Sequence, residues 1–235
     1  MNPVLAEAEK SIKTVMEDRM LNSYIEHTIL KPDSSREQVL KVCREAVENN
    51  FAGACIPPYF LQHARKEIPD NSETQLVTVI GFPMGYNMTS IKAEEAKKAI
   101  DDGADELDMV MNIAAFKSGN LPFVQDDIES IVTIGRLKNK LVKVIIETGL
   151  LSDEEIIKAC AICAKAEVPY VKTSTGINAG GAKSEHVKLM REHLPKSIKI
   201  KASGGIRSTE FANELIELGA DRLGTSSGLS LINAS

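Results

Sequence analysis

The chain has 235 residues, of which 43% are hydrophobic and 26% charged, and its net charge at neutral pH is −5. This length fits two small domains or one large α/β barrel, and the composition is that of a globular protein. The acidic balance without a dense basic cluster argues against a nucleic-acid partner, and no apolar run approaches the ~18–20 residues that a membrane helix needs.

Hydrophobic periodicity and turn residues predict an N-terminal helix followed by eight strands that alternate with helices. The first helix covers about residues 3–20, which lack a secretory pattern, so we expect a cytoplasmic protein. Strands are predicted at 24–30, 52–56, 75–81, 104–110, 141–147 and 220–225, and within 168–176 and 198–205, two stretches that run into glycine turns. Helices are predicted at about 35–49, 57–69, 91–102, 121–139, 184–193, 208–218 and 228–232 and after Ser152, with a loop at 112–120.

This alternation indicates a parallel sheet with right-handed crossovers, and eight such units close into a (β/α)8 TIM barrel. We expect one α/β domain over residues 1–235, with an N-terminal capping helix at 1–22 and the barrel at 23–235. In this fold the active site lies at the C-terminal ends of the strands.

Two neighbouring predicted strands each carry a lysine where a barrel strand is normally apolar. These are Lys172 and Lys201, and in both strands a serine follows two residues later, Ser174 and Ser203. Since side chains alternate along a strand, each lysine shares a face with its serine. A buried amine is costly unless it finds a partner, stays neutral or does chemistry, and the plain alternative is a lysine that reaches solvent at a strand end.

Further charges fall on the inner face of the fourth and fifth predicted strands. Asp108 shares its face with Glu106, and Lys143 shares its face with Glu147. Barrel interiors are usually filled by branched apolar side chains, so this pattern indicates either a catalytic cluster or a buried ion-pair network. We favour the catalytic interpretation for Lys172, Lys201 and Asp108, whereas Lys143 and Glu147 fit a supporting role better.

An activated amine is energetically reasonable in this setting. A free lysine has a pKa of ~10.4, which must fall to roughly 7 for nucleophilic attack at neutral pH, at a cost of about 4–5 kcal/mol. A like charge ~4 Å away in an effective dielectric of ~20 supplies about 4 kcal/mol, and burial acts in the same direction. One lysine beside another therefore fits a Schiff base with a carbonyl substrate.

The loops after the seventh and eighth predicted strands fit a phosphate group. They are rich in glycine and serine, as phosphate loops of barrels often are, although glycines also serve plain turns. The residues that we predict to bind the phosphorylated substrate are Gly176, Gly204, Gly205, Arg207, Gly224, Ser226 and Ser227.

Several other reactive residue types have a structural interpretation. Cys160 and Cys163 have CxxC spacing, but they fall within a predicted helix and no second pair exists, so packing is favoured over zinc or redox chemistry. The four histidines show no metal-ligand spacing. Cys55, at a strand end, either lines the pocket or packs as a core thiol.

Taken together, these residues resemble the deoxyribose-phosphate aldolase family. The resemblance extends from residues 25–32 to residues 224–227, and its specific blocks are 79–85, 103–110, 143–149, 171–176 and 201–207. It implies a metal-free class I aldolase without a cofactor that reversibly cleaves 2-deoxy-D-ribose 5-phosphate to D-glyceraldehyde 3-phosphate and acetaldehyde. By motif match, Lys172 would form the Schiff base, Lys201 would lower its pKa and Asp108 would transfer protons. We expect supporting pocket residues at Glu26, Thr28, Cys55, Lys143, Thr175 and Ser203.

The chain departs from the family pattern at two places. Glu26 stands where many relatives have aspartate, and the chain ends without the C-terminal tyrosine that helps to protonate the enamine in some relatives. Two rival functions remain at this stage: a Schiff-base aldolase that acts on a ketose phosphate, and a non-catalytic barrel that binds sugar phosphates. The resemblance also favours a homo-oligomer, either a dimer or a tetramer, with a small phosphorylated sugar as the substrate.

Overall fold

The computed structural model describes residues 20–233, and its eight parallel strands close into one barrel in chain order from β1 to β8. The strands are β1 Ile25–Thr28, β2 Gly53–Ile56, β3 Gln75–Ile80, β4 Glu106–Val110, β5 Leu141–Ile145, β6 Tyr170–Lys172, β7 Lys199–Ser203 and β8 Arg222–Thr225. This confirms the predicted (β/α)8 TIM barrel. The predicted helix at residues 3–20 lies outside the described residues, except for Met20.

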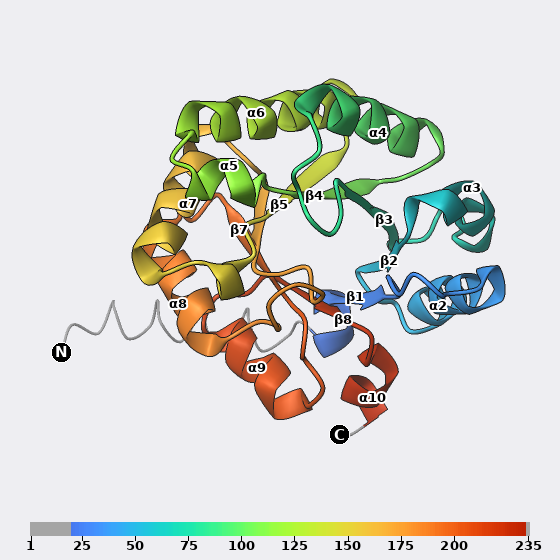
Figure 1. The fold of residues 1–235 in the computed structure, drawn as a ribbon. Helices are drawn as coiled ribbons and strands as arrows, with labels where there is room; N and C mark the ends of the chain where they lie inside the picture. The colour runs from blue at the N-terminus through green and yellow to red at the C-terminus, as the bar shows by residue number, and fades with distance from the viewer. Residues whose placement is uncertain (1–19, 234–235) are drawn as a thin grey trace.

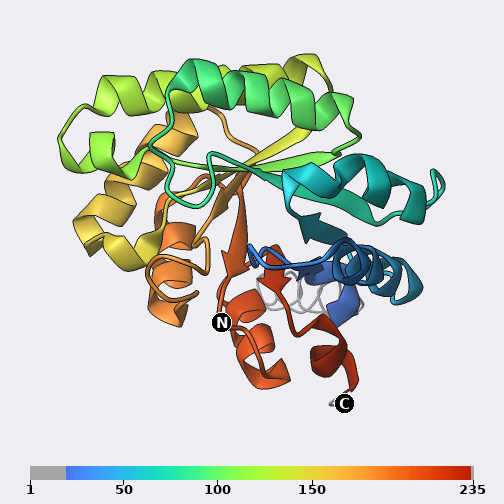
Figure 2. The ribbon, with the colours of Figure 1, turned by 45° about the vertical axis from the view of Figure 1, so that its right-hand side comes forward.

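Helices surround the strands as an outer ring (Figure 1). The α-helices are α2 Arg36–Glu48, α3 Leu61–Ala64, α4 Thr89–Asp101, α5 Ile113–Lys117, α6 Leu121–Leu137, α7 Asp153–Lys165, α8 Ser184–His193, α9 Thr209–Glu217 and α10 Gly228–Asn233. Short 3₁₀ turns are η1 Leu21–Tyr24, η2 Pro58–Phe60, η3 Arg65–Glu67 and η4 Thr148–Leu150. The last helix, α10, packs against α9 and β1 (Figure 2). No helix among residues 20–233 is long and apolar enough to cross a membrane.

Local sequence signals explain the N-termini of several helices. Ser35 and Ser152 each form a capping box with the residue three positions later, and Ser208 caps α9. Thr89 is the first residue of α4 and Met88 holds the N-cap position, so α4 has no side-chain cap. The Thr89 hydroxyl donates to Asp127 at 2.8 Å and so ties the start of α4 to α6.

Three predicted elements differ from the structure. The helix expected over residues 57–69 is broken into η2, α3 and η3, and the loop expected over 112–120 contains α5, which Asn112 caps. The fifth strand ends at Ile145, so Glu147 lies beyond it, with a left-handed φ of 57°. The expected alternation from Lys143 to Glu147 therefore stops before Glu147.

The barrel has two separate apolar regions. The larger one lies between strands and helices and contains Leu107 and Met109, the outward-facing residues of β4. A second, smaller cluster joins Cys55, Val77 and Val79 of β2 and β3. Val79 pairs in register with Asp108, and side chains paired in this way point to the same side of a sheet. The barrel interior therefore has an apolar wall on β2 and β3 that faces the charged side chains of the other strands.

Candidate active site

Strand register places the predicted catalytic residues next to one another inside the barrel. Lys172 pairs with Lys201 across β6 and β7, and Asp108 pairs with Lys143 across β4 and β5. All four side chains are buried, with Lys172 the most accessible at 2%. Lys172 is the last residue of β6, so its amine lies at the end of the barrel where such folds carry their active sites.

Asp108 joins the two lysines that the sequence singled out. Its Oδ2 atom accepts hydrogen bonds from Lys172 Nζ and from Lys201 Nζ, both at 2.7 Å, and Oδ1 accepts from Lys143 Nζ at 3.0 Å. Because Lys172 and Lys201 share one oxygen atom, their nitrogens lie no farther apart than twice that hydrogen-bond length. The structure therefore brings the two amines and the carboxylate into one compartment.

Glu26 extends the network toward the other end of the barrel. It contacts the Lys201 ammonium, accepts from Arg222 at 2.9 Å and lies 3.1 Å from Lys143 Nζ. Glu106 also contacts Lys143, and it lies 3.4 Å from Arg222. Glu26 and Lys143 thus serve as internal counter-ions rather than as pocket surface, since both are fully buried.

Glu106 and Arg222 also belong to the charged cluster, although neither was predicted from the sequence as a site residue. The available signal was the alternation of side chains: Glu106 lies two residues before Asp108, and Arg222 lies two residues before Gly224. Residues two positions apart share a face, so both belonged to the inner surface of the barrel. What the alternation could not give was the partner of each charge.

The cations keep the two central carboxylates ionised. Burial alone would raise the pKa of Glu26, but Lys143 and Lys201 outweigh it and lower that pKa to about 2 from its usual 4.5. Burial likewise opposes ionisation of Asp108, yet its three lysine partners hold its pKa well below the usual 3.8. A carboxylate in this state is a hydrogen-bond acceptor throughout the physiological pH range.

Lys143 and Lys201 stay protonated because neighbouring carboxylates outweigh the effect of burial on their pKa values. Burial would lower the pKa of Lys143, but Asp108, Glu106 and Glu26 raise it well above the usual 10.5. Burial would also lower the pKa of Lys201, and Asp108 and Glu26 again raise it above 10.5. Lys143 and Lys201 are therefore ammonium ions in the folded protein.

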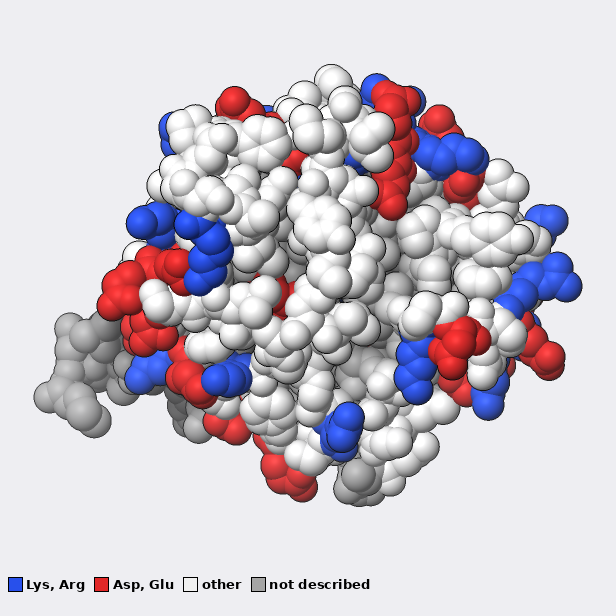
Figure 3. Space-filling model, in the orientation of Figure 1, with Lys and Arg blue, Asp and Glu red and all other residues white. Residues whose placement is uncertain are grey.

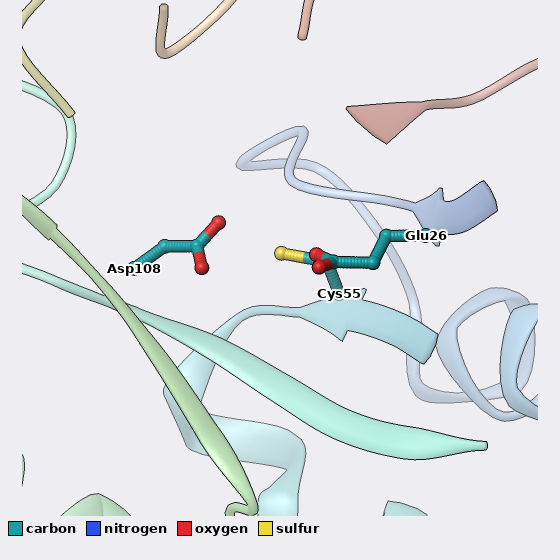
Figure 4. Close-up of side chains that lie close together, drawn as sticks. All are labelled: Glu26, Cys55 and Asp108. Carbon is teal, nitrogen blue, oxygen red and sulfur yellow. The ribbon is translucent and has the colours of Figure 1, made fainter. Parts of the chain in front are cut away.

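Figure 4 shows Cys55 beside the carboxylates of Glu26 and Asp108. The thiol and one oxygen of each carboxylate lie within 4.8 Å of one another, a donor set that could hold a cation. Both carboxylates already contact two cations, the ammonium groups of Lys201 and Lys143. Burial raises the pKa of the Cys55 thiol to about 11, so the thiol remains protonated beside them.

Gly224 leaves the space that Lys201 occupies. A Cβ atom at this position would lie 3.0 Å from Lys201 Cε and 2.9 Å from Ser203 Cβ. Ser203 itself is buried, and its hydroxyl donates to the carbonyl of Ser174 at 2.6 Å, which ties the end of β7 to the chain after β6. The glycine predicted as a phosphate contact therefore has a clear packing role beside the second lysine.

The remaining predicted phosphate residues lie in the loops after β6, β7 and β8. Gly204 and Gly205 adopt left-handed φ values of 86° and 75°, and Ser227 directly precedes α10. Thr225 orders this turn, because its Oγ1 atom accepts from the Ser227 N–H at 2.9 Å and its hydroxyl donates to the Ile206 carbonyl at 2.7 Å. The exposed residues of the set are Gly176, Gly205, Arg207 and Ser226.

Thr28 and Thr175 differ in their availability to a ligand. Thr28, at the end of β1, is partly exposed and donates to the carbonyl of Glu26 at 3.0 Å. The hydroxyl of Thr175 is buried and donates to Glu147. Thr175 thus shapes the loop after β6 through its internal hydrogen bond.

The cysteines with CxxC spacing pack within the helical layer. Cys160 and Cys163 belong to α7, and both are buried free thiols. Burial raises the pKa of Cys160 to about 12. This placement agrees with the packing interpretation.

Comparisons with known proteins point to a single family. The model of the DeoC/LacD family aldolases matches residues 19–232. A deoxyribose-phosphate aldolase of Clostridium tetani is 47% identical over 215 residues, which cover 92% of this chain and 99% of that protein. A deoxyribose-phosphate aldolase of Caldicellulosiruptor saccharolyticus is 46% identical over 219 residues, with 93% and 99% covered. The tetrameric deoxyribose phosphate aldolase of Aeropyrum pernix superimposes with a TM-score of 0.84 at 31% identity, covering 91% of this chain and 90% of that chain.

Proposed function

The chain belongs to the DeoC/LacD family of aldolases, and we propose that it forms a Schiff base with its substrate through Lys172. Its activity is that of a deoxyribose-phosphate aldolase, which is a lyase. The reaction is the reversible cleavage of 2-deoxy-D-ribose 5-phosphate to D-glyceraldehyde 3-phosphate and acetaldehyde. The roles of individual residues in this reaction are our proposal.

The observation that carries the proposal is the charge balance around Asp108. The network contains four basic side chains, Lys143, Lys172, Lys201 and Arg222, and three acidic ones, Glu26, Glu106 and Asp108. With every group ionised, the cluster carries one excess positive charge. Among the described residues Lys172 contacts one carboxylate, whereas Lys201 contacts two and Lys143 three. Loss of the Lys172 proton would balance the cluster and leave a neutral amine where a nucleophile is needed.

The chemistry follows from that neutral amine. Lys172 Nζ adds to C1 of the open-chain aldehyde to form a carbinolamine. The carbinolamine takes up a proton from solvent and loses water, which gives a protonated imine that withdraws electrons from C2. Removal of the C3 hydroxyl proton then forms the carbonyl of glyceraldehyde 3-phosphate as the C2–C3 bond breaks, with its electron pair passing into an enamine. Protonation of C2 and hydrolysis of the imine release acetaldehyde and restore Lys172.

Asp108 and Lys201 serve the proton transfers in this scheme. The depressed pKa of Asp108 makes it a weak base by itself, so we assign it to hold the imine nitrogen and to orient the water that moves protons. Lys201 keeps its proton, and it provides positive charge close to the reacting nitrogen. We assign protonation of the enamine to water held at this cluster.

We place the substrate phosphate at the loops after β7 and β8. The left-handed Gly204 and Gly205 and the serines before α10 present backbone and hydroxyl donors there. We further propose that the barrel at residues 23–235 acts as one domain within a homo-oligomer. Sedimentation of the purified protein tests the oligomer, and a monomer at all concentrations would contradict it.

Borohydride reduction in the presence of acetaldehyde tests the Schiff base. We expect an ethyl adduct on the peptide that contains Lys172, identified by mass spectrometry, and no adduct in the Lys172→Leu variant. Cleavage of deoxyribose 5-phosphate without any adduct on Lys172 would refute the assignment of the Schiff base to this residue.

A further inference from the structure

Glu147 is a buried acid outside the charged network. It follows β5 with a left-handed φ of 57° and is fully buried. Its sequence position placed it with Lys143 on the inner face of the strand, but its carboxylate turns instead to the loop between β6 and α8. A non-glycine residue in this conformation costs free energy, and such strain persists only where surrounding contacts hold it.

Three donors from the β6–α8 loop converge on the Glu147 carboxylate. The Thr175 N–H donates to Oε1 at 3.1 Å, and the Thr175 hydroxyl donates to Oε2 at 2.5 Å. Asn178 Nδ2 donates to Oε2 at 3.2 Å and also to the carbonyl of Pro83 at 2.8 Å. The Glu147 carboxylate thus ties the loop after β6 to the end of β5, and the Asn178 amide ties the same loop to the loop after β3.

The same loop reaches the predicted phosphate turn on its other side. The Ala182 N–H donates to the carbonyl of Gly204 at 3.0 Å, and a Cβ at Gly181 would lie only 2.1 Å from that oxygen. A Cβ at Gly204 would lie 3.2 Å from the Cα of Gly176. The backbones are therefore in direct contact, so a displacement of the loop that holds Thr175 would also displace the turn at Gly204.

We propose that Glu147 is a positioning residue that fixes the β6–α8 loop against the Gly204 turn and so sets the affinity for the phosphorylated half of the substrate. The inference rests on the proposed aldolase reaction and deepens it. Glu147 contacts neither Lys172 nor Asp108 through a hydrogen bond or ion pair, among residues 20–233. Acetaldehyde carries no phosphate, so its bond to Lys172 should not depend on the loop.

Glu147→Gln tests this role with little change of shape. The amide offers one acceptor oxygen in place of two, and its NH₂ group would face the donors of Thr175 and Asn178. We expect the KM for deoxyribose 5-phosphate to rise about tenfold, equivalent to about 1.4 kcal/mol. Borohydride trapping of acetaldehyde on Lys172 should proceed at the wild-type rate.

Glu167→Gln is the matched control. Glu167 also has a left-handed φ, of 51°, but it is exposed and pairs with Arg136 on the surface. This variant should retain the wild-type KM. An unchanged KM in Glu147→Gln, or a trapping rate that falls in the same proportion as the turnover of deoxyribose 5-phosphate, would overturn the proposal.

Asn178→Ala provides a second test if Glu147→Gln does not fold, as judged by circular dichroism. It removes the hydrogen bonds to Glu147 and Pro83 from a partly exposed side chain. We expect the KM for deoxyribose 5-phosphate to be about threefold above the wild-type value. This ratio is equivalent to about 0.65 kcal/mol at RT of about 0.59 kcal/mol. An unchanged KM would overturn the proposal. Absence of any acetaldehyde adduct in the wild-type protein would instead refute the Schiff-base function, while the comparison of KM values would still decide the role of Glu147.

Discussion

Replacement of Lys201 by leucine would test the charge balance that underlies the proposed mechanism. The substitution removes the ammonium that shares Asp108 Oδ2 with Lys172, and it leaves Glu26 and Asp108 with one cation fewer. Two charges ~5 Å apart in an effective dielectric of ~20 interact by about 3 kcal/mol. The form of the cluster that carries the extra proton would therefore be favoured by about 3 kcal/mol relative to the wild-type protein.

The assay is the pH dependence of kcat/KM for deoxyribose 5-phosphate cleavage. In Lys201→Leu the acidic limb should move about 2 pH units upward, so the activity near neutral pH falls about 100-fold and partly returns in alkaline buffer. Lys199→Leu is the control, because Lys199 lies on the same strand but is exposed, with its Nζ atom 5.6 Å from the centre of the Tyr170 ring. An acidic limb at the wild-type position in Lys201→Leu would refute the charge-balance argument.

Three further predictions concern packing and stability. Gly224→Ala should lower kcat while the fold is retained, because the added Cβ would lie 3.0 Å from Lys201 Cε. Steady-state kinetics would measure kcat and circular dichroism would report the fold. A variant with the wild-type kcat would contradict this prediction. Lys92→Met should destabilise the protein by about 3–5 kcal/mol in urea unfolding, since it leaves Asp127 buried without its ion pair; a loss below about 1 kcal/mol would count against this. The pKa of Glu26 is about 2 in the folded protein, compared with its usual value of 4.5. The ionised carboxylate therefore contributes its full stabilisation above pH 4.5, and this contribution is lost as the pH falls through about 2. The free energy of unfolding should therefore decrease over that window, and Glu26→Gln should flatten the dependence; identical slopes in both proteins would contradict the assignment.

The alternation of side chains made the centre of the site predictable. It placed Asp108, Lys172 and Lys201 on the inner surface, and strand order made their strands neighbours or near neighbours. Which oxygen meets which nitrogen depends on register and side-chain rotamers, which a periodic pattern does not contain. Glu147 illustrates the limit: the chain leaves the strand at Ile145, and a left-handed backbone turns the carboxylate toward another loop.

The surface around the barrel mouth also depends on loops that periodicity does not describe. The loop between β3 and α4 crosses the front of the molecule in Figure 1 and carries the exposed apolar residues Met84, Tyr86 and Met88. In the same orientation, charged side chains lie mainly around the edge of the face and its middle is largely uncharged (Figure 3). The charges of the interior are buried, so dissolved salt screens them much less than it screens the charges of the outer surface.

A buried cluster that must hold both a neutral amine and a cationic imine needs a particular charge count. With Lys172 neutral, the three remaining cations balance Glu26, Glu106 and Asp108, and formation of the protonated imine adds one positive charge at the same nitrogen. Asp108 already lies 2.7 Å from that nitrogen, so its carboxylate stabilises the added charge without rearrangement of the cluster. Conversion of the cationic imine to the neutral enamine removes the added positive charge. Removal of this charge contributes to the driving force for breaking the C2–C3 bond. The ion pairs of the interior therefore accommodate the reacting nitrogen both as a neutral amine and as a cationic imine.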